Sequence, residues 1–414
     1  MTGHAGAQDR VSLLRALEAL RNGVPNGDAV NALGCAQPQV LGRFEEQLEE
    51  LGANPPPVVT GALVSGDFGA GKSHLLEYLE HIAVSRGFVC SRVVISKETP
   101  LHDPSKVVQA ALREARFPDG RGSVIHELAS RIDYRSRQAA AFVEWAMSAP
   151  GLIGATVHLH ERSHEHELIA RILDFWSGEK IGVAEVRAGL KSVGSRGAYD
   201  VKAIKIRDLA PLRLEFATRF ARAVGMRGWV LLIDELELAG RYTLQQRAKS
   251  YAELARWLGL AEGAVPGVAV VATITDDFDI KVLQEKDDLV LVPERLRSKG
   301  TEDAVLLAAR AEVGMRAIER DKIPLMLPNE ETLKETYTRL EDIYSRAYGA
   351  APQLDTTVTT MRRPIRSYIR RWINEWDLLR YRPDAHLDTE VGELEQRYDE
   401  EPELGQGSAE SDGE

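Results

Sequence analysis

The spacing of apolar residues predicts that the chain begins with helices. Apolar positions three and four residues apart run from about 11 to 20 and again from about 40 to 51, which is the period of a helix buried on one face. Between them, Gly23-Val24-Pro25-Asn26-Gly27 breaks the pattern. Asn54-Pro55-Pro56-Pro57 ends the second helix. We therefore expect an N-terminal helical segment over residues 1–50.

After residue 57 the pattern alternates between strands and helices. Short apolar runs at 58–64, 88–95, 229–233 and 268–274 are typical of buried strands, and residues 74–85 have helical spacing. This alternation predicts an α/β fold with a parallel sheet covered by helices. Residues 101–225 are mainly helical by pattern, with a Gly/Ser-rich loop at 192–197. We therefore expect a core over 51–300 with a large helical insertion at about 101–225.

The C-terminal third is again helical by pattern, followed by a polar tail. We expect residues 301–384 to form a helical or winged-helix lid, and residues 385–414, which hold few apolar groups, to be disordered. No apolar run approaches the roughly 18–20 residues of a membrane helix, and the first ten residues lack a signal-peptide core. Only Cys35 and Cys90 are cysteines. We therefore expect a cytoplasmic protein without a disulfide framework.

The net charge is unevenly distributed along the chain. The formal charge is −11, from 52 Lys and Arg against 63 Asp and Glu, and residues 388–414 carry 11 acids and one base. The body is therefore nearly neutral, so the acidic total does not exclude a nucleic-acid partner. Residues 362–382 hold seven arginines and two acids. One face of this predicted helix is apolar, which leaves the arginines to bind phosphate of duplex DNA or ATP, or to pair with acids elsewhere. We also hypothesise that the acidic tail competes with DNA for basic surface.

The sharpest motif lies between the first strand and the next helix, where residues 66–73 match GxxxxGK[ST], the P-loop. Glycines let successive N–H groups point at phosphate oxygens, and the helix that follows adds its N-terminal dipole. Lys72 is expected to reach the β- and γ-phosphates, and the Ser73 hydroxyl to bind Mg²⁺. The expected ATP-binding residues are Gly66, Asp67, Phe68, Gly69, Ala70, Gly71, Lys72, Ser73 and His74.

A second motif is typical of the carboxylates that assist hydrolysis. The apolar run Trp229–Ile233 ends in Asp234 and Glu235, a Walker B pattern. Asp234 is expected to hold Mg²⁺, directly or through water, and Glu235 to orient and activate the attacking water. No NKxD, TKxD or LSGGQ-like string is present, so the motifs of GTPases and transporter-type ATPases are missing.

Other polar residues are candidates to complete such a site. The strand at 268–274 runs into Thr275, our first choice for a γ-phosphate sensor of the kind found in AAA+ and related additional-strand ATPases, with Thr273 second. Arg295 and Arg297 are candidate arginine fingers, which would imply a homo-oligomer, and Arg247 is a weaker candidate. The candidate lid arginines are Arg362, Arg363 and Arg366.

A histidine-rich stretch offers a competing chemistry. Residues 160–164 satisfy HExxH, the zinc-peptidase string, and His158 and His166 lie beside it. The flanking residues are mostly polar, whereas the metal-binding helix of such peptidases has apolar flanks. We interpret the histidines as the surface of a polar helix in the insertion, and a zinc hydrolase with a regulatory P-loop is the weakest hypothesis.

Four blocks together resemble a known family. They are Ala19–Pro25 (ALRNGVP), Gly66–Leu79 (GDFGAGKSHLLEYL), Leu231–Glu237 (LLIDELE) and Arg366–Arg380 (RSYIRRWINEWDLLR). These blocks are similar to the ATP-binding P-loop proteins of BREX phage-defence systems, the BrxC/BrxD type. The length of 414 residues is closer to the compact BrxD-like members. The resemblance implies an AAA+ fold related to origin-recognition and STAND ATPases, and a role in bacterial defence beside helicases or methyltransferases.

Two functional hypotheses follow from these patterns. The first is a Mg²⁺-dependent ATPase that couples turnover to DNA engagement with a helicase or another defence-complex protein. The second is a nucleotide-dependent switch or scaffold that assembles partner proteins and hydrolyses ATP slowly if at all.

Overall fold

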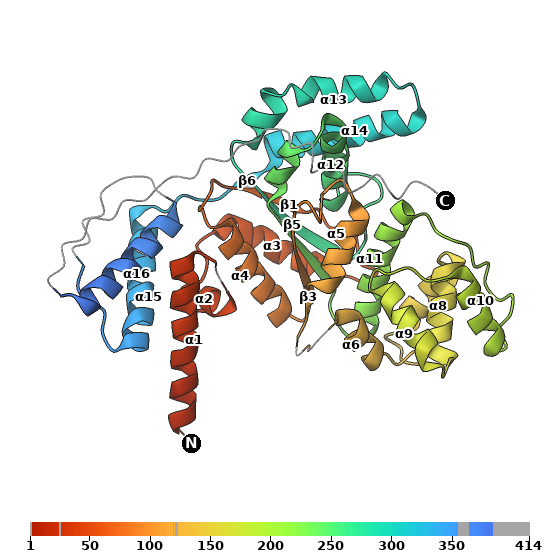
Figure 1. Ribbon diagram of the computed structural model, residues 1–414, viewed down its shortest axis with the longest axis horizontal. Coiled ribbons are helices and arrows are strands. Elements are labelled where there is room, and N and C mark those ends of the chain that lie inside the picture. Colours follow the sequence, from red (N-terminus) through yellow and green to blue (C-terminus); the bar gives the residue numbers. More distant parts are fainter. Residues whose placement is uncertain (1, 25, 119, 121–122, 355–363, 384–414) are drawn as a thin grey trace.

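A six-stranded sheet forms the centre of the molecule (Figure 1). The computed structural model describes residues 2–24, 26–118, 120, 123–354 and 364–383. The strand order is β3-β2-β4-β5-β1-β6, and all pairs are parallel except β2 with β3. The strands are β1 (Ala62–Ser65), β2 (Val89–Val94), β3 (Ala115–Arg116), β4 (Trp229–Asp234), β5 (Val268–Ile274) and β6 (Ile323–Pro324). The mainly parallel α/β sheet expected from the sequence is confirmed.

The central strands are apolar on both faces because helices cover both faces of the parallel sheet. Every residue of β4 and β5 is buried. Val230 and Leu232 pack with α3 (Pro38–Leu51) and α4 (Lys72–Ser85), whereas Leu231 and Ile233 pack with α5 (Pro104–Arg113) and α11 (Ile206–Ala223). A strand covered on both faces reads as a continuous apolar run rather than as an alternating one.

The chain between β2 and β4 is mainly helical, apart from the short strand β3 and the connecting loops. Its elements form a lobe beside the sheet, at the right of Figure 1. The remaining helices of this lobe are α6 (Val124–Arg131), α7 (Ala140–Ser148), α8 (Gly151–Arg162), α9 (His166–Trp176) and α10 (Val183–Ser192). Its core is aromatic: Trp176, Phe216 and Phe220 lie with ring centroids 4.8–5.4 Å apart.

A third group of helices follows β4 and β5. It comprises η1 (Leu236–Arg241), α12 (Leu244–Trp257), η2 (Asp279–Gln284), α13 (Asp288–Arg297), α14 (Glu302–Arg316) and η3 (Ala317–Asp321). α14 packs closely along α12, where a Cβ on Gly314 would lie 1.9 Å from the Tyr251 carbonyl oxygen. Residues 301–321 therefore belong with the core. Among the described residues of 301–384, β6 is the one strand, and it pairs with β1.

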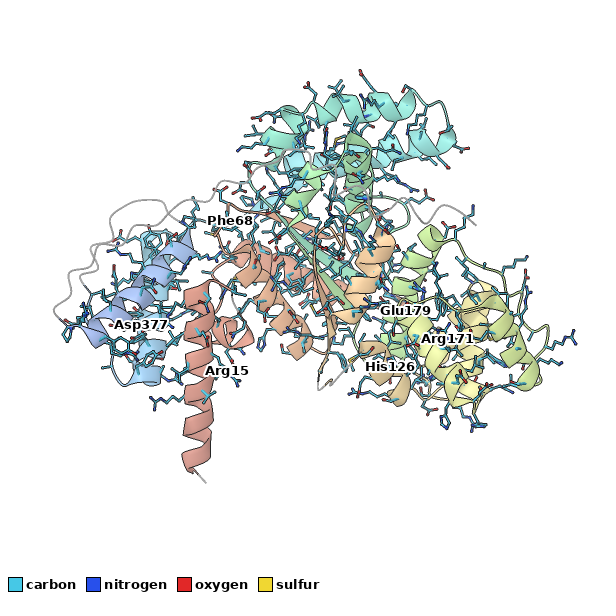
Figure 2. All side chains as sticks on the ribbon, in the orientation of Figure 1. Arg15, Phe68, His126, Arg171, Glu179 and Asp377 are labelled. Atoms are coloured by element: carbon cyan, nitrogen blue, oxygen red, sulfur yellow. The ribbon has the colours of Figure 1, made fainter. Side chains whose placement is uncertain are left out.

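The N-terminal helices and the last two described helices meet in one helical unit. α1 (Thr2–Asn22) and α2 (Gly27–Leu33) pack with α15 (Glu330–Tyr348) and α16 (Ile365–Tyr381) around a shared core that includes Leu17, Tyr344 and Trp376. We call these helices the four-helix cap. Figure 2 places Arg15 and Asp377 in the cap, and Arg171 and Glu179 in the lobe on the opposite side of the sheet.

The cap groups segments that the sequence pattern had assigned to separate regions, 1–50 and 301–384. The acidic tail at 385–414 lies outside the described residues. In the part of the chain that the structure describes, no helix has the length and apolar character needed to span a membrane.

Candidate functional site

The P-loop joins β1 to α4 at the carboxyl end of the sheet. Gly69 (φ +81°) and Gly71 (φ +105°) hold left-handed backbone that only glycine adopts without strain. Gly71 is the last residue before α4, so its conformation turns the chain directly into the helix at Lys72. The Gly66 N–H donates to the carbonyl of Ile274 at 3.1 Å, which fixes the loop to the end of β5. Ligands of open α/β sheets bind at this edge.

Lys72 lies at the centre of the loop and is largely buried. Its Nζ donates to the carbonyl oxygens of Gly66 at 2.6 Å and Asp67 at 3.4 Å, and lies 3.7 Å from Glu237 Oε1. The ammonium is therefore held within the loop by oxygen atoms on one side and by a buried carboxylate on the other.

Ser73 and Asp234 come together across 161 residues of sequence. Ser73 Oγ donates to Asp234 Oδ2 at 3.1 Å, and Asp234 is 2% exposed. Oδ1 of Asp234 accepts from Thr273 Oγ1 at 2.6 Å and from the Glu235 N–H at 3.1 Å. A hydroxyl beside a carboxylate is the hard oxygen donor set that Mg²⁺ prefers. The chemistry of Ser73 and Asp234 therefore fits a magnesium ion.

Arg92 of β2 is a functional neighbour that pattern reasoning missed. Its Nη2 donates to Asp234 Oδ2 at 2.9 Å and its Nη1 to Glu77 Oε2 at 3.2 Å. The guanidinium thus compensates the buried Asp234 charge and ties β2 to β4 and α4. The signal in the sequence was a single arginine inside an otherwise apolar or small-residue strand, VCSRVV.

Glu235 leaves the strand in an unusual backbone conformation. Its φ of +61° is one of two positive values at non-glycine residues in the described chain. Such strain is retained when a side chain must point in a required direction. Partial burial, together with the neighbouring Asp234 charge, raises the pKa of Glu235 above its ordinary value. The side chain remains accessible at the mouth of the cleft.

Glu237, two residues further on, is a buried carboxyl group that the sequence analysis did not single out. It is 4% exposed, and its Oε2 has no hydrogen-bond partner in the described part of the chain. Burial raises the pKa of Glu237 to about 7, opposed by the charge of Lys72. The group therefore changes charge near neutral pH, next to the lysine of the loop.

We expect ATP affinity to weaken as pH rises through about 7, because ionised Glu237 then competes with phosphate for Lys72. Glu237→Gln should match the unsubstituted protein at pH 6, and across pH 6–8.5 it should show only the pH dependence that the titration of ATP itself causes. Since the titration of ATP itself is common to both proteins, the difference between their Kd values, measured by calorimetry, isolates Glu237. Parallel pH profiles for the two proteins would contradict this assignment.

The raised pKa of Glu237 also makes the stability of the fold depend on pH. Between about pH 4.5 and 7 the folded state binds more protons at Glu237 than the unfolded state does. The free energy of unfolding should therefore fall as pH rises through this window.

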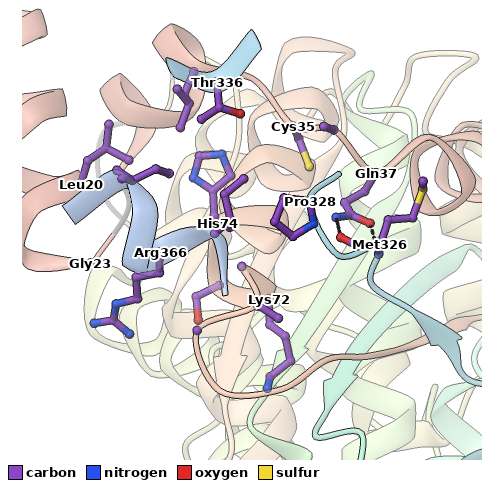
Figure 3. Close-up of a pocket in the computed structure, with 18 of the residues that line it drawn as sticks. Leu20, Gly23, Cys35, Gln37, Lys72, His74, Met326, Pro328, Thr336 and Arg366 are labelled. Atoms are coloured by element: carbon purple, nitrogen blue, oxygen red, sulfur yellow. Dashed lines mark hydrogen bonds between the residues drawn. The ribbon is translucent and has the colours of Figure 1, made fainter. Parts of the chain in front are cut away.

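A cleft opens above the P-loop, between the core and the four-helix cap (Figure 3). The cap contributes an apolar wall, which includes Leu20, Leu33 and Ile369, and Met326–Pro328 continue it after β6. His74 Nε2 lies 2.7 Å from the Gly34 carbonyl oxygen and joins α4 to the cap. Gln37 pairs with both backbone polar groups of Met326, at 3.1 and 2.8 Å, as Figure 3 shows. The cleft thus has a polar end at the P-loop and an apolar end at the cap.

Arg366 closes the cleft from the first turn of α16. Its guanidinium carbon lies 5.9 Å from the centre of the Phe68 ring in the P-loop, and its Nη2 donates to the Asn22 carbonyl at 3.4 Å. Of the three candidate lid arginines, Arg366 lines the cleft, while Arg362 and Arg363 lie outside the described residues.

Gly23 makes room for this arginine. It has φ +69°, and a Cβ there would lie 2.1–2.5 Å from three side-chain atoms of Arg366. Gly23→Ala should displace Arg366 and weaken ATP binding several-fold. It should also lower the free energy of unfolding by more than roughly 1 kcal/mol, which is the cost of placing an alanine in left-handed backbone. Urea unfolding and calorimetry measure the two effects. Gly194→Ala is the matched control, since Gly194 has φ +74° and no atom within 4 Å. The role of Gly23 would be contradicted if Gly23→Ala lost no more stability than Gly194→Ala and bound ATP with unchanged affinity.

Comparison with known proteins agrees with this geometry. Residues 12–117 match the family model of the BREX system ATP-binding protein BrxC/D. The resemblance noted in the sequence is therefore confirmed over this segment, which contains its N-terminal and P-loop blocks. The match runs from within α1 to just after β3 and contains the P-loop together with the α1 and α2 residues that line the cleft, whereas the lining residues from Asp234 onward lie outside it. No curated protein and no solved structure matches the chain.

The two candidates for the γ-phosphate sensor, Thr273 and Thr275, lie outside the segment that matches the BrxC/D family model. They occupy different positions. Thr273 of β5 donates to Asp234, whereas Thr275 lies buried one residue beyond the strand. The second choice of the sequence analysis is thus the threonine that touches the Walker B aspartate. Ala272 of β5 pairs with Ile233 of β4. The next residue of β5, Thr273, therefore lies beside the next residue of β4, Asp234.

The arginine-finger candidates do not line this cleft. Arg295 and Arg297 lie on α13, where Arg297 Nη2 contacts Glu312 Oε2 at 2.7 Å. Arg247 is buried and gives Asp288 two donors at 2.7 Å, with Tyr251 OH donating to the same carboxylate. The weaker proposal for Arg247 as a finger is wrong, since this arginine fixes α13 to α12.

The histidine-rich stretch is part of the lobe and is spread over two helices. His160 packs against Trp176, with ring centroids 4.9 Å apart, and its Nδ1 lies 2.8 Å from Tyr134 OH. His158 Nε2 lies 2.8 Å from Ser195 Oγ. In the described chain, no group of three His, Cys, Asp or Glu side chains has a metal-binding arrangement.

Proposed function

We propose that this chain is a Mg²⁺-dependent ATPase of the BrxC/BrxD type that acts in bacterial anti-phage defence. The observation that carries the proposal is the 3.1 Å contact between Ser73 of the P-loop and Asp234 of β4, with Glu235 beside it. Two motifs 161 residues apart in sequence thus form one acidic, phosphate-binding corner. The family match over residues 12–117 supports ATP as the nucleotide.

In this proposal each residue has a separate task. The P-loop N–H groups and Lys72 bind the phosphates, while Ser73 and Asp234 hold Mg²⁺, which neutralises phosphate charge when bound. Glu235 takes a proton from the attacking water, and its raised pKa makes the carboxylate a stronger base than an ordinary glutamate. Arg366 and the apolar wall of the cap exclude water above the cleft. Thr273 orients Asp234.

The strand order supports an additional-strand ATPase of the AAA+ type. β5 lies between the P-loop strand β1 and the Walker B strand β4. We infer that Arg295 or Arg297 acts on the site of a neighbouring subunit in a homo-oligomer, since neither lines the cleft of its own chain. We place the protein in the cytoplasm, engaging duplex DNA together with a helicase or another defence protein. The closer relation to compact BrxD-like members stays a prediction.

The second candidate is a slow nucleotide switch that assembles partner proteins. The hold of Arg92 on Asp234 and the proximity of Glu237 to Lys72 favour it, because both contacts compete with ligand binding.

An ATPase assay with and without duplex DNA, on protein of measured oligomeric state, separates the two functions. Turnover that rises with DNA supports the coupled ATPase. Nucleotide-dependent assembly without turnover supports the switch, and failure to bind ATP contradicts both.

A further inference from the structure

We propose that the outer surface of the helical lobe binds the phosphate backbone of duplex DNA. The surface consists of α10 and the segment after it, with Arg187, Lys191, Arg196, Lys202 and Lys205, and we call it the α10 surface. This inference deepens the DNA engagement proposed above, but it does not depend on ATP hydrolysis. The sequence had predicted the C-terminal arginines as the DNA contact, and the α10 surface is a second basic region of the chain.

The packing of α10 leaves one of its faces outward. Val186, Gly189 and Leu190 are buried against the other helices of the lobe. At Gly189 a Cβ would lie 2.7 Å from Leu168 of α9 and 3.1 Å from Leu159 of α8. Ala184, Arg187, Ala188 and Lys191 therefore occupy the exposed side. Figure 1 shows α10 at the edge of the lobe that is remote from the sheet.

The segment after α10 is fixed against the lobe by its backbone. Arg187 Nη2 donates to the Val201 carbonyl at 2.7 Å, and the Ser195 N–H donates to the Leu190 carbonyl at 2.8 Å. Val201 is itself buried. The cations at 196, 202 and 205 thus project from an anchored segment, which keeps them close to those of α10.

This surface is strongly basic in a chain whose total charge is −11. Residues 183–205 contain five basic residues and two acids: Asp200 pairs with Lys202 at 2.6 Å, and Glu185 pairs with Arg171 at 3.5 Å. Within the described chain, Lys191, Arg196 and Lys205 form no ion pair. Two arginines of α16 are less available: Arg371 pairs with Glu375 at 2.6 Å, and Arg366 faces the cleft.

The chemistry of the surface favours phosphate over a protein partner. Protein interfaces depend on a few large apolar or aromatic side chains that become buried. Across residues 150–205 the structure describes no exposed large hydrophobic side chain. Ala184 and Ala188 are small, which lets a nucleic-acid backbone approach between the flanking cations. Neutralising phosphate with lysine and arginine gives binding that depends steeply on salt.

The test uses the full chain and a fluorescent 30-base-pair DNA duplex, with anisotropy measured at several salt concentrations. The triple variant Lys191→Glu/Arg196→Glu/Lys205→Glu should lose at least tenfold in affinity. Its slope of log K against log salt should become shallower by about two to three, at roughly 0.9 per phosphate contact. ATP binding and the melting temperature should be unchanged.

Two variants serve as matched controls. Lys97→Glu/Lys299→Glu/Lys334→Glu changes the same charge at exposed lysines elsewhere and should lose much less affinity. Arg370→Glu/Arg371→Glu tests α16. The proposal is overturned if the triple variant binds like the unsubstituted protein, if the lysine control loses as much, or if the α16 variant alone loses binding. It is also overturned if the unsubstituted chain binds no duplex DNA. Because ATP binding is measured separately, these outcomes leave the proposed ATPase function independently testable.

Discussion

Replacing Lys72 with alanine is expected to abolish ATP binding, with at least a 100-fold increase in Kd measured by calorimetry. The ammonium is the one buried cation at the phosphate end of the described cleft, and the loop carbonyls already orient it. Charge-assisted bonds to phosphate are worth about 1.5–3 kcal/mol each, and a bound triphosphate would accept more than one. The P-loop N–H groups alone would not compensate for this loss.

The fold should tolerate this change. Removing Lys72 leaves Glu237 buried without its cation, but a carboxyl group whose pKa is already about 7 can become neutral at little cost below that pH. Circular dichroism should therefore be unaffected at pH 6.5. Lys97→Ala, at an exposed lysine beyond β2, is the control and should bind ATP normally. Tight ATP binding by the Lys72 variant would refute the P-loop assignment.

The elements that the sequence predicted are those defined by local pattern. The apolar runs at β4 and β5 and the glycine spacing before α4 depend only on neighbouring residues. The strand order and register depend on distant residues, and they explain why Thr273, the second choice, reaches Asp234. The sequence showed where β5 should end. Which threonine of this strand lies beside Asp234 follows only from the pairing of Ala272 with Ile233.

The parts that could not be predicted depend on contacts between distant segments. The four-helix cap joins Leu17 near one end of the chain to Trp376 near the other, and no periodic pattern links them. Arg92 and Glu237 are similar cases, because their roles come from burial beside Asp234 and Lys72. The sequence showed a charged residue in a buried environment, and only the fold identifies its partner.

Replacing Glu235 with glutamine is expected to stop ATP turnover while leaving ATP binding intact. General-base catalysis contributes on the order of 10²–10⁴-fold to rate, so phosphate release should fall by that factor. Glutamine keeps the size of the side chain and the backbone conformation at φ +61°, but it cannot accept a proton from water. Asp234 and Ser73 remain in place, so the Kd for ATP should change less than threefold. Single-turnover phosphate release and calorimetry separate the two quantities.

If Glu235 is the general base, the loss of turnover must be specific to the carboxylate at position 235. Glu98→Gln, at an exposed glutamate beyond β2, controls for the loss of one negative charge and should retain full turnover. If Glu235→Gln hydrolyses ATP at the unsubstituted rate, Glu235 is not the base, and the slow-switch function gains support. If turnover and binding are lost together, the strained backbone at Glu235 serves the structure of the site rather than proton transfer. Binding without turnover is the expected result only if the left-handed backbone of Glu235 serves to position its carboxylate.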